Sequence, residues 1–264
     1  MSIGRNIPEH DMLFPCIGVR GRLAPAVLAI AAAVVMPAGA QTVSPPVAEY
    51  VTAGRGTFDL SNKTLFPLRV VLEPRGFTVT ERGAVQELPL DTAVVRVRLS
   101  ASSVRIPPRG RVTIAYEATA AAYPAWFVIV STLVGARTSN GLAVRVELPH
   151  VVYLQQPSPL READVAVVGV EVDAGAGRAR VHLRNASPRL GRVRTLELSN
   201  GDLTEAAGSF PLLPGMYRMV ELPWRGASPP AMVALRLGDR VLRAAAVPLK
   251  PPAIVTSASS APSP

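Results

Sequence analysis

Cysteine is almost absent from this sequence of 264 residues. Its single copy, Cys16, lies within the first forty residues. Residues 41–264 therefore form no disulfide and carry no thiol chemistry. A segment of this length is large enough to be stabilised by burial of apolar side chains alone. It corresponds to one large domain or two small ones.

Histidine is also scarce, and residue types that support catalysis do not cluster. Beyond residue 40 the only histidines are His150 and His182. Metal sites use several histidines, cysteines or carboxylates together, so the sequence predicts no metal site. It contains neither the G-x-S-x-G motif of hydrolases nor a glycine-rich phosphate loop. We therefore predict a protein that is not an enzyme and that uses no cofactor.

Lysine accounts for only two of the 28 basic residues, Lys63 and Lys250, and the formal net charge is +9. The arginines are spread through alternating segments, as Arg96 and Arg98 are, rather than gathered beside aromatic residues. Nucleic-acid binding requires a focused basic surface. The sequence therefore predicts no nucleic-acid partner.

Only one stretch resembles a membrane or export segment, and it lies near the N-terminus. Arg20 and Arg22 precede the uncharged residues 23–36, and an A-x-A sequence follows at 38–40. This order is typical of a secretory signal peptide. A membrane anchor needs about 20 apolar residues, whereas this stretch has fourteen. We predict that residues 1–40 are a cleaved signal, starting at Met1 or Met12, and that the mature protein is periplasmic and spans no membrane.

The remaining sequence is rich in short segments in which apolar and polar residues alternate. Such alternation over residues 94–99, 111–116, 144–148 and 178–183 is typical of half-buried strands. Turn sequences separate these segments, among them Asn-Gly at 140–141 and at 200–201. The alanine-rich residues 118–122 allow one helical turn, but no long amphipathic helix is present. The pattern predicts an all-β fold of the sandwich type.

Two proline-containing segments divide the chain. Residues 155–159 combine glutamine, serine and proline as a linker does, and residues from 251 onward are mostly proline, serine and alanine. We therefore predict a signal peptide (1–40), a first sandwich domain (41–155), a second (156–250) and a disordered tail (251–264). Asn62 and Asn185 each begin an N-x-[ST] glycosylation pattern, which we interpret as chance in a sequence of bacterial character.

Several segments resemble, in order and spacing, those of the periplasmic chaperones that assemble pili, the PapD-like family. In the first predicted domain the similar segments are 58–62, 65–70, 105–114, 126–130 and 140–154. In the second they are 181–185 and 212–218. The resemblance covers most of residues 45–250. It implies two immunoglobulin-like sandwiches in tandem.

The resemblance also implies a function and partners. Family members cap pilus subunits by donor-strand complementation, a form of β-augmentation, and act with an outer-membrane usher. The donor strand presents apolar side chains at every second position, and here Leu142, Val144, Val146 and Leu148 do so. The first three match the family's subunit-binding positions. The alternation is equally compatible with side chains that face the domain's own core.

One departure from the family concerns the anchor for the subunit's terminal carboxylate. The family uses an Arg and a Lys, whose positions fall near Pro46 and Val151 in this sequence. Neither residue is cationic, so either another arginine replaces them or the client is held differently. The alternative function is a non-catalytic surface protein that uses its sandwiches for adhesion or support.

Overall fold

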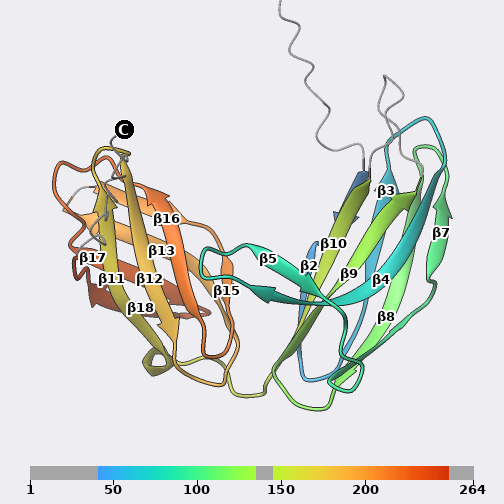
Figure 1. Ribbon diagram of the computed structural model, residues 1–264, viewed down its shortest axis with the longest axis horizontal. Helices are drawn as coiled ribbons and strands as arrows, with labels where there is room; N and C mark the ends of the chain where they lie inside the picture. Colours follow the sequence, from blue (N-terminus) through green and yellow to red (C-terminus); the bar gives the residue numbers. More distant parts are fainter. Residues whose placement is uncertain (1–40, 135–144, 202, 250–264) are drawn as a thin grey trace, which may run out of the picture. The chain divides into compact units, whose positions relative to one another are not determined.

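The computed structural model describes residues 41–134, 145–201 and 203–249, and the predicted signal peptide and tail lie outside them (Figure 1). The described chain is all-β, as predicted, with one short 3-10 helix, η1 (Glu162–Asp164). No helix in these ranges is long and apolar enough to cross a bilayer. The strands are β1 (Gln41–Ser44), β2 (Val47–Val51), β3 (Gly54–Asn62), β4 (Leu68–Val79), β5 (Val85–Leu88), β6 (Val95–Leu99), β7 (Ser103–Ile106), β8 (Arg111–Ala120), β9 (Ala125–Val134), β10 (Val146–Gln155), β11 (Val165–Asp173), β12 (Arg178–Asn185), β13 (Gly191–Asn200), β14 (Leu203–Ala207), β15 (Phe210–Leu212), β16 (Tyr217–Pro223), β17 (Met232–Leu237) and β18 (Arg240–Ala245).

The first ten strands form two sheets that enclose one apolar core. One sheet has the order β1-β3-β8-β6, and the other has the order β2-β10-β9-β4-β5 with β7 beside β4. Alternate residues of each strand point inward, which is why Phe58, Ile114 and Ile129 are buried together. The chain thus forms the sandwich that the alternating segments predict.

Strands β11–β18 form a second sandwich with its own core. Its sheets have the orders β11-β12-β16 and β14-β13-β17-β18, with β15 beside β13. Val181, Leu196 and Leu235 are fully buried in this core. Within the described residues no sheet combines strands of the two groups. The domain bounds predicted from the sequence, 41–155 and 156–250, stay a prediction.

The alternating segments correspond closely to strands. Residues 94–99, 111–116 and 178–183 fall largely in β6, β8 and β12, and 144–148 leads into β10. The helical turn allowed for 118–122 is wrong, because β8 continues to Ala120. Ala118 and Tyr116 are two positions apart and both are buried, so both side chains lie on the inward face of the strand. Packing against the opposite sheet overrides the alanine propensity for helix.

The two sandwiches share a turn motif built on a buried asparagine. The Asn62 amide nitrogen donates to the carbonyl oxygens of Phe66, Ile106 and Pro107, and its oxygen accepts from Thr64. Asn185 binds Arg189, Leu212, Leu213 and Ser187 in the same pattern. In both N-x-[ST] sequences the asparagine side chain therefore links two turns by hydrogen bonds. Their amide nitrogens are buried and occupied, which is unsuited to carrying a glycan.

Candidate functional site

Strand β10 has one fully paired edge and one partly open edge. It pairs antiparallel with β9 from Val146 to Leu154. On its other side it pairs in parallel with β2 only from Val151 to Gln155 (Figure 1). Among the described residues, nothing pairs with β10 on that side between Val146 and His150. This leaves a short stretch of strand edge without a neighbour.

The direction of the backbone groups along this edge follows from strand geometry. The N–H of Val151 donates to the carbonyl oxygen of Pro46 at 2.8 Å, toward β2. Backbone groups point to alternate edges along a strand, so Glu147 and Pro149 face the same side as Val151. The open edge therefore offers the N–H and C=O of Glu147 and the C=O of Pro149. Proline has no N–H to leave unpaired, which suits it to an edge.

Two of the four predicted donor residues lie on this stretch. Val146 and Leu148 are half-buried and pack against the core of the first sandwich. Their side chains share the inward face with Val152 and Leu154, which are fully buried farther along β10. Leu142 and Val144 lie outside the described residues. Val146 and Leu148 thus sit where the core opens at the end of the sandwich, beside the unpaired backbone.

The outward face of the same stretch is charged. Glu147 accepts hydrogen bonds from the Arg145 guanidinium at 2.8 and 2.6 Å, and Thr132 lies at 3.4 Å. The bonds from Arg145 lower the pKa of the Glu147 carboxyl, so it is ionised at neutral pH. Glu147 is therefore a polar position on the solvent side of β10, opposite the apolar side that carries Val146 and Leu148.

His150, the residue after Pro149 in β10, is buried and has no exposed surface. Its Nδ1 lies 2.7 Å from the carbonyl oxygen of Pro45, and its Nε2 lies 3.1 Å from the Tyr116 hydroxyl. That hydroxyl also bonds Tyr50 at 2.9 Å, and the His150 ring stacks on Phe58 with centroids 4.5 Å apart. Burial lowers the pKa of His150 and raises that of Tyr116, so both are neutral. The sequence alone marks this histidine as one of two beyond residue 40 but gives no sign of its partners.

The two positions predicted for the family's carboxylate anchor do meet in the structure. Pro46 and Val151 are joined by the backbone hydrogen bond described above. Neither side chain carries charge, and the neighbouring His150 ring is neutral and buried. The place where the family holds a carboxylate is therefore an uncharged junction between β2 and β10 in this chain.

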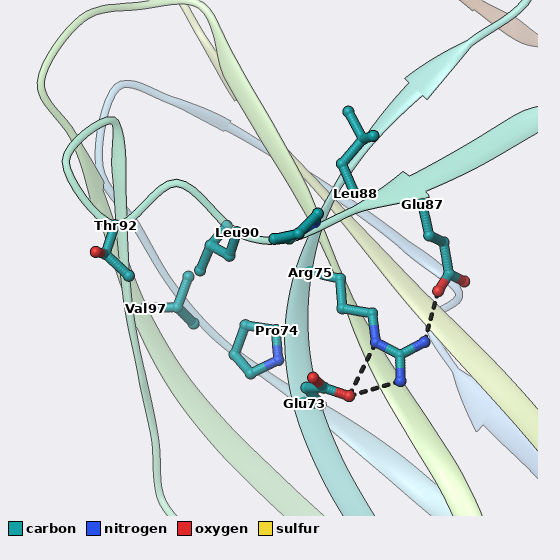
Figure 2. A pocket seen from close by; sticks show the side chains of 9 residues that line it. Glu73, Pro74, Arg75, Glu87, Leu88, Leu90, Thr92 and Val97 are labelled. Atoms are coloured by element: carbon teal, nitrogen blue, oxygen red, sulfur yellow. Dashed lines mark hydrogen bonds and ion pairs between the residues drawn. The ribbon is translucent and has the colours of Figure 1, made fainter.

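A hollow of about 720 Å³ lies elsewhere in the first sandwich and is lined by residues of β4, β5, the following loop and β6 (Figure 2). Figure 2 shows Arg75 between two carboxylates, with Nε 2.9 Å from Glu73 and Nη1 2.6 Å from Glu87. These contacts raise the pKa of Arg75 and satisfy its charge internally. The hollow therefore offers no uncompensated cation, and its apolar wall of Leu88, Leu90 and Val97 is open to solvent. We assign it no function.

Comparison with known proteins was made at the level of sequence and of structure. No family model and no curated protein matches the sequence. In structure, a chain of the Salmonella enterica SafA pilin–SafB chaperone complex is similar with a TM-score of 0.50 and 10% identity, covering 78% of this chain and 95% of that chain. The class 5 fimbriae chaperone CfaA has a TM-score of 0.48 at 9% identity, covering 79% and 100%. The Escherichia coli chaperone DraB has a TM-score of 0.45 at 12% identity, covering 78% and 96%.

These likenesses concern the fold. At 10% identity, the match with a TM-score of 0.50 shows a similarity of fold to a chain of that chaperone complex, in agreement with the two-sandwich architecture that the resemblance implied. The likenesses do not address individual residues of the β10 edge.

Proposed function

We propose that this protein is a chaperone that captures pilus or fimbrial subunits by donor-strand complementation along β10. The observation that carries the proposal is the open edge at Glu147 and Pro149, with Val146 and Leu148 on the adjoining apolar face. An unpaired edge beside apolar side chains is what β-augmentation requires. The fimbrial-chaperone fold supports this choice of client class.

The proposed mechanism is stoichiometric binding and involves no bond-making chemistry. A client strand hydrogen-bonds the exposed backbone of Glu147 and the carbonyl of Pro149. At the same time Val146 and Leu148, with Leu142 and Val144 before them, fill the client's apolar groove. Pairing covers the client's own open edge, which would otherwise aggregate. Periplasmic location, an outer-membrane usher as partner, and the signal peptide at residues 1–40 belong to the same proposal.

A substitution at Glu147 tests the backbone part of the proposal. Glu147→Pro removes the one N–H that the open edge offers between Val146 and His150, while the groups that pair with β9 belong to neighbouring residues. The preceding residue, Val146, is already extended, as proline demands. We expect tagged Glu147→Pro protein recovered from the periplasm to carry at least tenfold less bound subunit than the parent protein.

Glu147→Ala is the matched control, because it keeps the N–H and loses only side-chain contacts. These are the ion pairs with Arg145 at 2.6 Å and Arg75 at 3.8 Å and the hydrogen bond from Thr132, each worth up to about 1 kcal/mol. We expect this control to retain subunit within about twofold, with unfolding transitions of both variants close to the parent's. Equal capture by Glu147→Pro and the parent would reject pairing at this edge and favour the alternative of a passive adhesive or structural protein. Mass spectrometry of the bound material identifies the client.

A further inference from the structure

The turns that follow β3 and β7 in the first sandwich carry exposed apolar side chains and exposed cations. Leu65 and Phe66, in the turn between β3 and β4, are 65% and 74% exposed. Lys63, Arg69, Arg105 and Arg109 lie in the same turn, at the start of β4, in β7 and in the turn after β7, and all are exposed. We call these six residues the basic tip. It shares no residue with β10.

Hydrogen bonds hold the two turns of the basic tip together. Asn62 donates to Phe66 at 2.8 Å and to Pro107 at 3.0 Å, and the N–H of Arg109 donates to Thr64 at 3.1 Å. The backbone N–H of Phe66 reaches the Thr64 hydroxyl at 3.4 Å. The backbone groups of Phe66 are therefore satisfied inside the protein. A segment with this property can enter a poorly hydrated environment without stripping water from unpaired backbone groups.

The charge of the basic tip is of one sign. Residues 62–69 and 103–111 contain no acidic residue, and within the described chain none of the four tip cations forms an ion pair. Asp59, on the neighbouring strand, is engaged by Arg111 and Thr113. Arg69 and Arg105 are directly opposite each other in the β4–β7 ladder. Like charges in such a pair repel, so an anionic surface beside them would relieve a strain present in the free protein.

We infer that the basic tip binds the surface of an anionic bilayer, with Leu65 and Phe66 inserted between headgroups and the four cations on the phosphates. A protein partner fits the observations less well, because specific protein interfaces bury about 800 Å² on each side. The exposed apolar part of the six-residue tip is only two adjacent side chains, Leu65 and Phe66. A small apolar wedge with basic neighbours matches interfacial membrane binding, in which burial and electrostatic attraction act together.

Sedimentation of the purified protein with vesicles tests the inference. We expect binding to vesicles of equal parts phosphatidylglycerol and phosphatidylcholine, and at least tenfold weaker binding to pure phosphatidylcholine. Leu65→Ser/Phe66→Ser should weaken binding to the acidic vesicles at least tenfold. Lys63→Glu/Arg109→Glu should weaken it at least as much, since each cation near an anionic surface contributes about fivefold. The matched control is Val85→Ser/Leu88→Ser, which removes two exposed apolar side chains on β5 and should bind like the parent.

Insertion is distinguished from adsorption by a Phe66→Trp variant and brominated lipid. The added indole fluorescence should be quenched on acidic vesicles, and the parent's own tryptophan fluorescence should not change. Loss of binding in the charge variant with full binding by Leu65→Ser/Phe66→Ser would overturn insertion. Equal binding to both vesicle types, or none to either, would overturn the inference altogether. So would a Leu65→Ser/Phe66→Ser variant that binds vesicles normally but no longer co-purifies with a protein partner. The outcome is independent of client capture at β10, which Glu147→Pro tests.

Discussion

His150 shows how a single buried residue can set the pH response of a domain. Its ring is neutral because burial lowers its pKa, and both ring nitrogens have partners inside the protein. In the unfolded chain the same ring takes up a proton below about pH 6.5. The unfolded state then binds more protons than the folded state, so stability is full above that pH and is lost as the pH falls.

We predict that the free energy of unfolding of the first sandwich decreases between pH 7 and pH 5. One proton limits the slope to about 1.4 kcal/mol per pH unit. His150→Leu should be less stable at pH 7, because it leaves the Pro45 carbonyl unpaired, but its stability should vary less over this interval. Urea denaturation followed by circular dichroism at several pH values measures both effects. His182→Asn, in the second sandwich, is the control and should keep the parent's slope.

At the scale of single residues, the sequence predicts which residues lie on strands but not which distant residues they contact. Alternation places His150 on a strand without showing that it faces Tyr116, which lies 34 positions away. The N-x-[ST] sequences illustrate the same limit. Their asparagines bind carbonyl groups from turns about 45 and 28 residues farther along the chain, and no local pattern indicates such a contact.

The repeated turn motif is the smallest element common to both sandwiches. Asn62 and Asn185 each join the end of one strand to a distant turn. Replacing Asn185 with alanine leaves three buried or partly buried carbonyl oxygens without their donor. Replacing Asn62 leaves two, those of Ile106 and Pro107, because the Phe66 carbonyl keeps the Thr64 hydroxyl at 3.0 Å.

We predict that Asn62→Ala and Asn185→Ala each lower the free energy of unfolding by about 3 kcal/mol, since unsatisfied buried groups cost about 1–3 kcal/mol. Urea denaturation of each variant measures the loss. Asn200→Ala is a suitable control, because Asn200 makes one exposed bond to the Pro229 carbonyl at 2.8 Å, and surface changes alter stability by about 0.5 kcal/mol or less. A decrease in the free energy of unfolding of less than 1 kcal/mol in both variants would show that the asparagine hydrogen bonds are not needed to hold the turns in place.

Elements are predicted better than their pairing. Period-two alternation locates β6, β8 and β12 because half-buried strands impose it. It does not show that β2 begins beside Val151 and so leaves Glu147 without a neighbour. The open edge depends on where another strand ends, which is a property of the sheet and not of β10.

For the molecule as a whole, the uncharged junction at Pro46 and Val151 decides how a client would be held. Charge-assisted hydrogen bonds to a carboxylate contribute about 1.5–3 kcal/mol, or at least tenfold in affinity. The described structure places no cationic side chain at either position.

We therefore predict that amidating the C-terminus of the client subunit weakens its complex with this protein by less than about threefold. Titration of the purified subunit and its amidated form by calorimetry measures the difference. A subunit extended by one uncharged residue is a useful control, because it keeps the terminal carboxylate and tests whether added bulk beside Pro46 and Val151 weakens binding by itself. A loss of tenfold or more on amidation would show that an arginine from elsewhere in the chain has taken over the anchor.

Pro149 has a consequence for the register of anything that joins β10. A bound strand can pair with Glu147 and with residues before it, but it finds no N–H at Pro149, and the next outward N–H, that of Val151, already belongs to Pro46. The ladder must therefore end at a fixed point. Pro149 ends the hydrogen-bond ladder and so fixes one end of the added strand. It also prevents two copies of this chain from pairing along the whole length of their β10 edges.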